Sequence, residues 1–302
     1  METNLPIEEI ISKVKHIEIK AKKLIEDNLI SNYHSIFKGK GIEFNETRNY
    51  LPGDDIRDID WNVTARMNEP YIKTYIEERQ LSIIFAVDTS ASNLFGVFKS
   101  KRQRMAEIVA FLGFTSFFNN DNCGLLLFSN DVEKYIPARK NYSHLLRIIR
   151  DSWYFEGKSK ATSLSKSLRS IFDLLKKKSV IFILSDFLDS GYENALLSLS
   201  KKHDVIPVVV KDNFEENINF QNINFPFIEK MNLLFEIKDS ETEFMDTIKV
   251  NFPEYRTKMK NYIEYYTKIF KRLSLDFIET YTDEDFKPIE LMLRIRLFKL
   301  RH

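Results

Sequence analysis

Residues 81–92 read Leu-Ser-Ile-Ile-Phe-Ala-Val-Asp-Thr-Ser-Ala-Ser, an apolar run that ends at Asp88 in a polar turn. A short apolar run bounded by turn residues predicts a buried strand. Similar runs occur further along the chain, at 124–128, 180–184 and 205–210. Helical patterns lie between or beside them, at 97–118, 142–152, 164–175 and 192–201. Nearly all-apolar strands that alternate with helices predict an α/β protein whose mostly parallel sheet is covered on both faces.

The two ends of the chain extend this pattern. Residues 7–30 have the apolar spacing of an amphipathic helix, and residues 39–79 carry turn and charge signals with little periodicity. Helices are predicted at 255–273 and 288–301, with strands at 275–281 and 233–237. We therefore expect an N-terminal helix and extension over 1–79. An α/β domain should follow over 80–302, with an inserted hairpin region near 213–250.

Composition excludes several classes of protein. The 302 residues are 43% hydrophobic, so we expect a hydrophobic core. Their formal net charge is +1, so we do not expect non-specific electrostatic binding of nucleic acid. The single cysteine, Cys123, directly precedes the predicted strand at 124–128 and can form no internal disulfide. We find no signal peptide and no run of 18 apolar residues, so we expect a cytoplasmic protein without an integral membrane segment.

Oxygen-bearing side chains cluster where the predicted strands end. Asp88, Ser90 and Ser92 alternate after the first strand, Asp186 follows the strand at 180–184, and Thr162 precedes a helix. Ligands of open α/β sheets bind at the carboxyl ends of the strands. Carboxylate and hydroxyl oxygens suit Mg²⁺ or Mn²⁺, so these five residues are a candidate metal site.

The run Asp88-x-Ser90-x-Ser92, with Thr162 and Asp186 at later strand ends, resembles the metal-ion-dependent adhesion site (MIDAS) of von Willebrand factor A domains. That resemblance implies a Rossmann-like fold. It also implies that Ser90, Ser92 and Thr162 are direct or near-direct ligands, while Asp88 and Asp186 bind the ion directly or through water. An open coordination position would then accept an acidic side chain of a partner protein.

A second block, at 39–66, resembles the signature of a bacterial family, the domain of unknown function fifty-eight. Its members are von Willebrand-like proteins often encoded beside MoxR-type AAA+ ATPases, so the resemblance implies such an ATPase as partner. The candidate signature residues are Arg48, Tyr50, Pro52, Gly53, Asp54, Asp55, Arg57, Asp60, Trp61 and Arg66. They read either as a structural ion-pair network, anchored on the domain by Trp61, or as a surface that docks a partner.

Three interpretations of the candidate metal site remain open. The first is a non-enzymatic interaction module that binds a partner through Mg²⁺. The second is a metal-free scaffold in which the same Ser and Asp residues cap helices. The third is a Mg²⁺-dependent phosphotransferase of haloacid-dehalogenase type, which needs a second Asp two positions after the first, where this chain has Ser90. No Gly-rich nucleotide loop of the GxxxxGK[ST] or GxGxxG type occurs.

Overall fold

The structure is a computed structural model of the 302-residue chain. It describes residues 7–24, 43–76, 82–90, 93, 99–155, 157, 163–212 and 252–299. The predicted strand at 233–237 and the hairpin region near 213–250 lie outside these residues.

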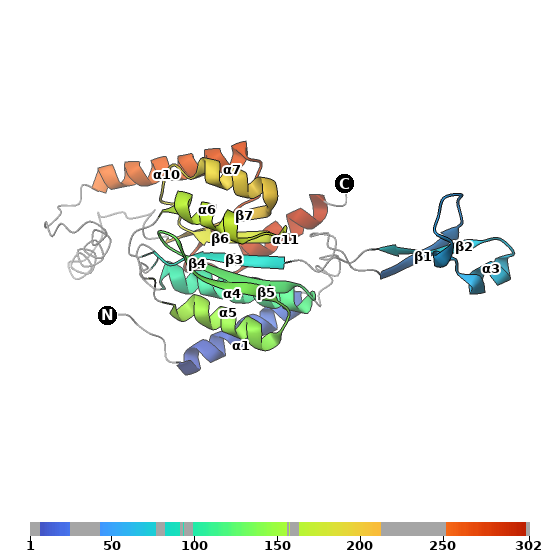
Figure 1. The fold of residues 1–302 in the computed structure, drawn as a ribbon. Helices are drawn as coiled ribbons and strands as arrows, with labels where there is room; N and C mark the ends of the chain where they lie inside the picture. Colours follow the sequence, from blue (N-terminus) through green and yellow to red (C-terminus); the bar gives the residue numbers. More distant parts are fainter. Residues whose placement is uncertain are drawn as a thin grey trace.

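A six-stranded sheet forms the centre of the molecule, in the order β5-β4-β3-β6-β7-β8 (Figure 1). Every neighbouring pair is parallel except β4 and β5, which are antiparallel. The strands are β3 (Ser82–Asp88), β4 (Asn122–Phe128), β5 (Val132–Arg139), β6 (Val180–Ser185), β7 (Asp204–Lys211) and β8 (Ile278–Tyr281). The predicted α/β fold class, with a mostly parallel central sheet flanked by helices, is confirmed.

Side chains of β3 alternate between two apolar layers, as the period of a strand requires. Ile83, Phe85 and Val87 enter one layer, whereas Ile84 and Ala86 enter the other. All five are at most 1% exposed. Because both faces are buried, the strand reads as a continuous apolar run.

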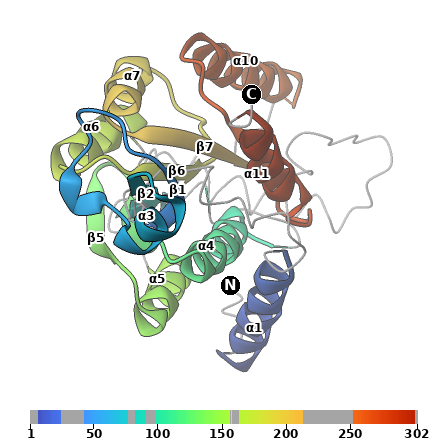
Figure 2. The same cartoon turned by 90° about the vertical axis from the view of Figure 1, so that its right-hand side faces the viewer.

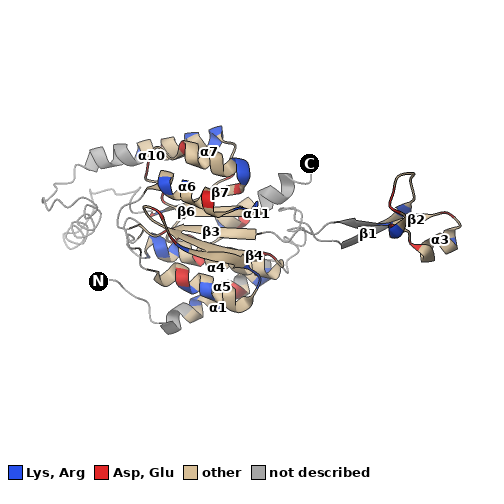
Figure 3. Cartoon of the chain, viewed as in Figure 1, with Lys and Arg blue, Asp and Glu red and all other residues tan. Residues whose placement is uncertain are grey.

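Helices cover both faces of this sheet (Figure 1). The layer with Phe85 is completed by α1 (Ile7–Leu24), α4 (Lys101–Phe118), α5 (Tyr142–Tyr154) and α11 (Lys287–Lys299). The layer with Ile84 is completed by α6 (Leu164–Leu174), α7 (Glu193–Lys202) and α10 (Phe252–Arg272). Charged side chains lie mainly on these helices, while β3 and β6 carry almost none (Figure 3).

Residues 43–76 form a separate projection, called the arm here (Figures 1 and 2). It contains β1 (Glu43–Asn49), the 3₁₀ turn η2 (Ile56–Asp58), α3 (Trp61–Met67) and β2 (Tyr71–Ile76). The two strands are antiparallel, and their register pairs Glu43 with Ile76 at the base. Among the described side chains of the arm, Ile72 is the one buried apolar residue, so the arm lacks a core of its own.

Some element limits differ from the sequence expectation. The helix predicted from residue 97 begins at Lys101, because the Ser100 hydroxyl accepts a hydrogen bond from Gln103 N (3.2 Å) and caps it there. Strand β5 was not predicted, since it alternates buried Ile136 with half-exposed Tyr135 at the sheet edge. Among the helices that the structure describes, none is both long and apolar enough to cross a membrane.

Candidate metal centre

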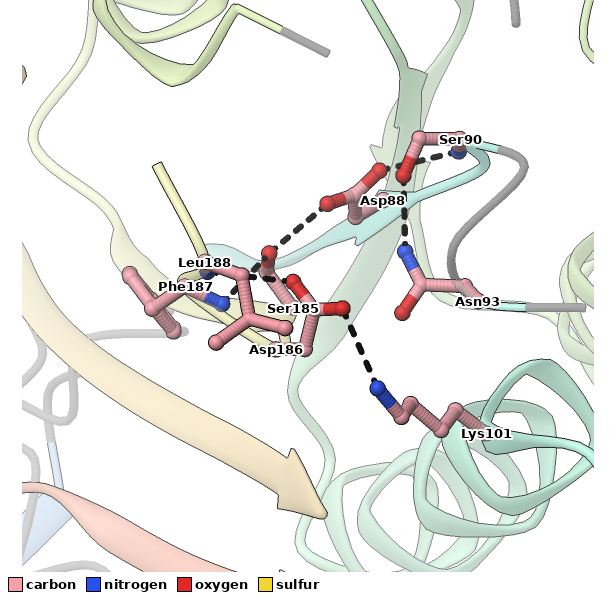
Figure 4. Close-up of polar contacts among 8 residues, drawn as sticks. All are labelled: Asp88, Ser90, Asn93, Lys101, Ser185, Asp186, Phe187 and Leu188. Atoms are coloured by element: carbon pink, nitrogen blue, oxygen red, sulfur yellow. Dashed lines mark hydrogen bonds and ion pairs between the residues drawn. The ribbon is translucent and has the colours of Figure 1, made fainter. Parts of the chain in front are cut away.

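Three of the five predicted ligands meet at one edge of the sheet (Figure 4). Asp88 is the last residue of β3, and Asp186 follows the last residue of β6. These strands are parallel neighbours, with Val87 opposite Leu184, so their carboxyl ends lie side by side. Ser90 lies in the turn after β3 and donates its amide N–H to Asp88 Oδ1 (2.9 Å). The other two predicted ligands, Ser92 and Thr162, lie outside the described residues.

The Asp88 carboxylate is fully buried and held from two sides. Its Oδ1 accepts the Ser90 amide, and its Oδ2 accepts the Ser185 hydroxyl (2.7 Å). Burial, followed by the negative charge of Asp186, raises the pKa of Asp88 to about 6, although the hydrogen bonds from Ser90 and Ser185 oppose this rise. The protein thus keeps a carboxylate where ionisation is unfavourable without a nearby cation.

The Asp186 carboxylate has a cationic partner. Its Oδ2 lies 3.2 Å from Nζ of Lys101, the first residue of α4, while its Oδ1 accepts the Leu188 amide (3.2 Å). Lys101 is 0% exposed and Asp186 is 7% exposed, so this ion pair is buried. Lysine is rarely buried without such a partner.

A tight turn after β6 fixes this edge. Phe187 has φ of +54°, a left-handed conformation that is unfavourable for a bulky residue. Its amide donates to the Ser185 hydroxyl (3.1 Å), and its buried ring packs edge-on against Phe270, 5.1 Å between centroids. The packing of this ring therefore stabilises a strained turn that holds Ser185 and Asp186 at this edge. The edge formed by the carboxyl ends of β3 and β6, with Asp88, Ser90 and Asp186, is called the rim here.

Sequence reasoning missed three contributors to this centre: Ser185, Asn93 and Lys101. Asn93 is 0% exposed and donates Nδ2 to the Ser90 hydroxyl (3.0 Å), while its Oδ1 has no hydrogen-bond partner. An unpaired buried oxygen on the side chain that bonds Ser90 is a further acceptor at this edge. Ser185 could have been found from its position, since it lies between the predicted strand at 180–184 and Asp186, but nothing in the sequence marks a helical lysine as buried.

The beginning of α6 also lies near this edge. The Leu164 amide donates to Asp189 Oδ2 (2.8 Å), in the loop after β6, and the Ser163 amide donates to Ser129 O (3.3 Å), after β4. Asp189 caps α6, whereas Ser163 makes no side-chain capping bond. These contacts tie the segment next to Thr162 to the loop that follows Asp186.

The donor set fits a hard divalent cation. All candidate donors are carboxylate, hydroxyl or amide oxygens, the ligands that Mg²⁺ and Mn²⁺ prefer. Over the described part of the chain, no group of three or more His, Cys, Asp or Glu side chains is placed to hold a metal. An ion at this rim would therefore depend on hydroxyl ligands as well as on Asp88 and Asp186.

The signature residues form their contacts inside the arm. Arg48 makes a forked pair with Asp54, with both N–O distances 2.8 Å, and Asp54 Oδ2 also accepts the Leu51 amide (2.8 Å). These bonds close the turn through Pro52 and Gly53, whose φ of +110° favours glycine. The side-chain hydrogen bonds hold the pKa of Asp54 below its ordinary value and raise that of Arg48.

Two acidic signature residues cap short helices. Asp55 Oδ1 accepts the Arg57 amide at the start of η2, and Asp60 Oδ1 accepts the Asn62 and Val63 amides at the start of α3. Tyr50 is half-buried, and its backbone N–H donates a hydrogen bond to the carbonyl oxygen of Pro70 (2.8 Å) at the end of the hairpin. The predicted ion-pair network is thus mainly one forked pair and two helix caps.

The prediction for Trp61 as an apolar anchor is wrong. Its side chain is 67% exposed at the first position of α3, so none of the described elements covers it. Arg57 and Arg66 are exposed as well. The other large apolar side chains exposed on the arm are Leu51, Ile56 and Met67, at 58–65%.

Comparison with known proteins places the chain in a family. A model described as "Protein of unknown function DUF58" matches residues 46–264, which cover most of the arm, the rim and most of the sheet. The chain belongs to the DUF58 family. The resemblance to this family drawn from residues 39–66 is therefore confirmed.

Two mycobacterial proteins of similar sequence are the uncharacterized proteins Mb1516 of Mycobacterium bovis and Rv1480 of Mycobacterium tuberculosis. Each is 26% identical over 211 residues, which cover 67% of this chain and 65% of the relative. This chain thus matches less than two thirds of the length of these two relatives.

Solved structures of similar shape include BatB from Bacteroides thetaiotaomicron, with a TM-score of 0.43, 12% identity and coverage of 73% of this chain and 98% of that one. An aerotolerance-related membrane protein from Bacteroides fragilis has a TM-score of 0.43, 13% identity and coverage of 72% and 99%.

Proposed function

We propose that this DUF58 protein is a non-enzymatic interaction module that captures an acidic side chain of a partner through a divalent cation. Asp88, Ser90 and Asp186 would hold Mg²⁺ or Mn²⁺ at the rim, with Ser92 and Thr162 completing the ligand set that the MIDAS resemblance implies. The bound ion would supply an open coordination position for a carboxylate.

One observation carries this proposal. Two buried carboxylates from adjacent parallel strands lie at the same sheet edge, beside the Ser90 hydroxyl and the unpaired Oδ1 of Asn93. Like charges placed together in a poorly solvated site disfavour folding unless something compensates for them. A cation-binding role gives a reason for keeping both.

The arm supports a protein partner as well. It exposes Leu51, Ile56, Trp61 and Met67, and it carries seven acidic against four basic residues. Exposed apolar side chains of this size on so small a unit favour a docking surface. We propose that the partner of the arm is the MoxR-type AAA+ ATPase implied by the family resemblance. The surface of that partner should have an apolar groove for the exposed side chains and basic residues around it that match the acidic excess of the arm.

Binding of the purified ATPase tests both surfaces. We expect capture by the wild-type chain in Mg²⁺, loss of capture with EDTA or with Asp88→Ala, and weakened capture with Trp61→Ala. Ser198→Ala, on the exposed side of α7, is a matched surface control. Equal capture by wild type, Asp88→Ala and EDTA-treated protein would contradict the metal-dependent proposal.

A metal-free scaffold is the second candidate, because the Lys101 ammonium already neutralises Asp186. Isothermal titration with Mg²⁺ and Mn²⁺ separates the two. Heat of binding that disappears in Asp88→Ala supports the metal module, whereas the absence of heat and of any thermal shift supports the scaffold.

A further inference from the structure

The buried lysine of α4 is not used by the proposed function. Lys101 is 0% exposed, and its ammonium lies 3.2 Å from Asp186 Oδ2 (Figure 4). Removal of an ammonium from water is strongly unfavourable, so its burial requires a compensating charge. Asp186 supplies that charge, at the rim where the divalent ion is proposed to bind.

The net charge at the rim disfavours simultaneous binding of the Lys101 ammonium and a divalent cation to Asp186. Asp88 and Asp186 contribute at most two negative charges, and Lys101 contributes one positive charge. A divalent cation held by the same carboxylates would lie close to the ammonium, and like charges repel strongly where water is excluded. The ammonium near Asp186 and the ion at the rim therefore oppose each other.

The neighbouring cation on the same helix shows that burial alone does not bring a side chain to the rim. Arg104 is 1% exposed and donates Nη2 to Thr280 Oγ1 (2.9 Å) and to Asp285 O (2.8 Å), beside β8. Its ion pair is with Glu107, and among the described residues its guanidinium bonds neither Asp88 nor Asp186. Arg104 is accordingly a matched control: a buried cation on α4 that points elsewhere.

We propose that Lys101 is a built-in counter-cation that occupies Asp186 in the metal-free protein and competes with the divalent ion. This inference rests on the proposed function, since it concerns regulation of the same centre. Lys101 lowers the affinity for the ion, and ion binding displaces the ammonium from Asp186. The centre then fills only when the ion or a partner carboxylate compensates for the lost ion pair.

Titration of the full chain with Mn²⁺, followed by electron paramagnetic resonance of the free ion, measures the affinity directly. We expect Lys101→Met to bind Mn²⁺ about tenfold more tightly than wild type, because the ion no longer meets a buried like charge beside Asp186. Lys101→Arg keeps the charge and should bind no more tightly than wild type. Arg104→Met should leave the affinity unchanged.

Thermal melting provides an independent measurement. In EDTA, Lys101→Met should melt below wild type, because Asp186 loses its buried partner; saturating Mn²⁺ should recover this loss. If Lys101→Met fails to fold by circular dichroism, Lys101→Gln carries the same test, since it keeps a hydrogen-bond donor without the charge.

The possible outcomes separate the two proposals. If wild type binds Mn²⁺ through Asp88 and the neutral Lys101 variants bind no more tightly, the proposed function stands and the competition is overturned. If only the neutral variants bind, Lys101 takes the place of the ion in the natural protein, and the metal-dependent function is overturned instead. If neither binds, both proposals fail.

Discussion

Replacement of Asp88 by asparagine should stabilise the metal-free protein, although the residue is fully buried. Burial and the charge of Asp186 raise the pKa of Asp88 from its ordinary 3.8 to about 6. Between these pH values the folded protein keeps a proton that the unfolded chain has lost. The free energy of unfolding therefore falls as pH rises from 3.8 to 6 and stays lower above pH 6, by about 3 kcal/mol in all.

Asparagine does not ionise, so the variant avoids this loss. Its Oδ1 can still accept the hydrogen bond from the Ser90 amide. Its Nδ2 replaces the Oδ2 of Asp88, so it must donate to the Ser185 hydroxyl instead of accepting from it, at a cost of about 1 kcal/mol. We expect a net gain of about 2 kcal/mol at pH 8 in EDTA. At pH 4 the gain should vanish and leave only the cost of the altered hydrogen bond.

Urea unfolding followed by circular dichroism, at pH 4 and pH 8 in EDTA, measures both values. A parallel series in Mg²⁺ should stabilise wild type and leave Asp88→Asn unchanged. The reasoning is refuted if the variant is less stable than wild type at pH 8, or if the difference between the two proteins is the same at both pH values.

Three further predictions concern the fold. Burial, with a smaller contribution from Lys202, lowers the pKa of His203 from 6.5 to about 4, so the free energy of unfolding should fall by about 3 kcal/mol as pH drops through that range; His203→Gln should remove this slope in urea unfolding. Gly124→Ala should cost about 2 kcal/mol in the same assay, because its Cβ would lie 2.9 Å from the backbone of Ile136 and of Ala138 in β5; an unchanged midpoint would contradict this contact. Trp61→Ala should change the free energy of unfolding by less than about 0.5 kcal/mol, since the ring is 67% exposed, and a larger loss would indicate a covering contact.

The sheet could be predicted because burial on two faces leaves a strong signal. β3, β4, β6 and β7 are apolar at nearly every position, and turn residues bound each run. β5 gives no such signal, because one of its faces is partly exposed and it contains Pro137 at the sheet edge. The arm was harder still, since its strands carry charged residues and bury only Ile72.

The rim was predicted in part, for a related reason. Asp88 and Asp186 could be recognised because each follows an apolar strand, and parallel strands bring such positions together. Lys101 could not, because its burial depends on how α4 packs against the sheet edge rather than on the residues beside it in the chain. Trp61 was misjudged because apolar character alone does not show which surface covers a side chain.

The strand register of the arm means that residues 43–76 can be removed or transferred as one unit. Because Glu43 pairs with Ile76, both connections leave from one end of the hairpin, at the ordinary separation of neighbouring strands. The arm could therefore be deleted and replaced by a short glycine-rich linker between these two positions, without altering any strand of the six-stranded sheet. The arm could likewise be grafted onto an unrelated hairpin, so that its adhesive properties can be studied apart from the cation chemistry of the rim.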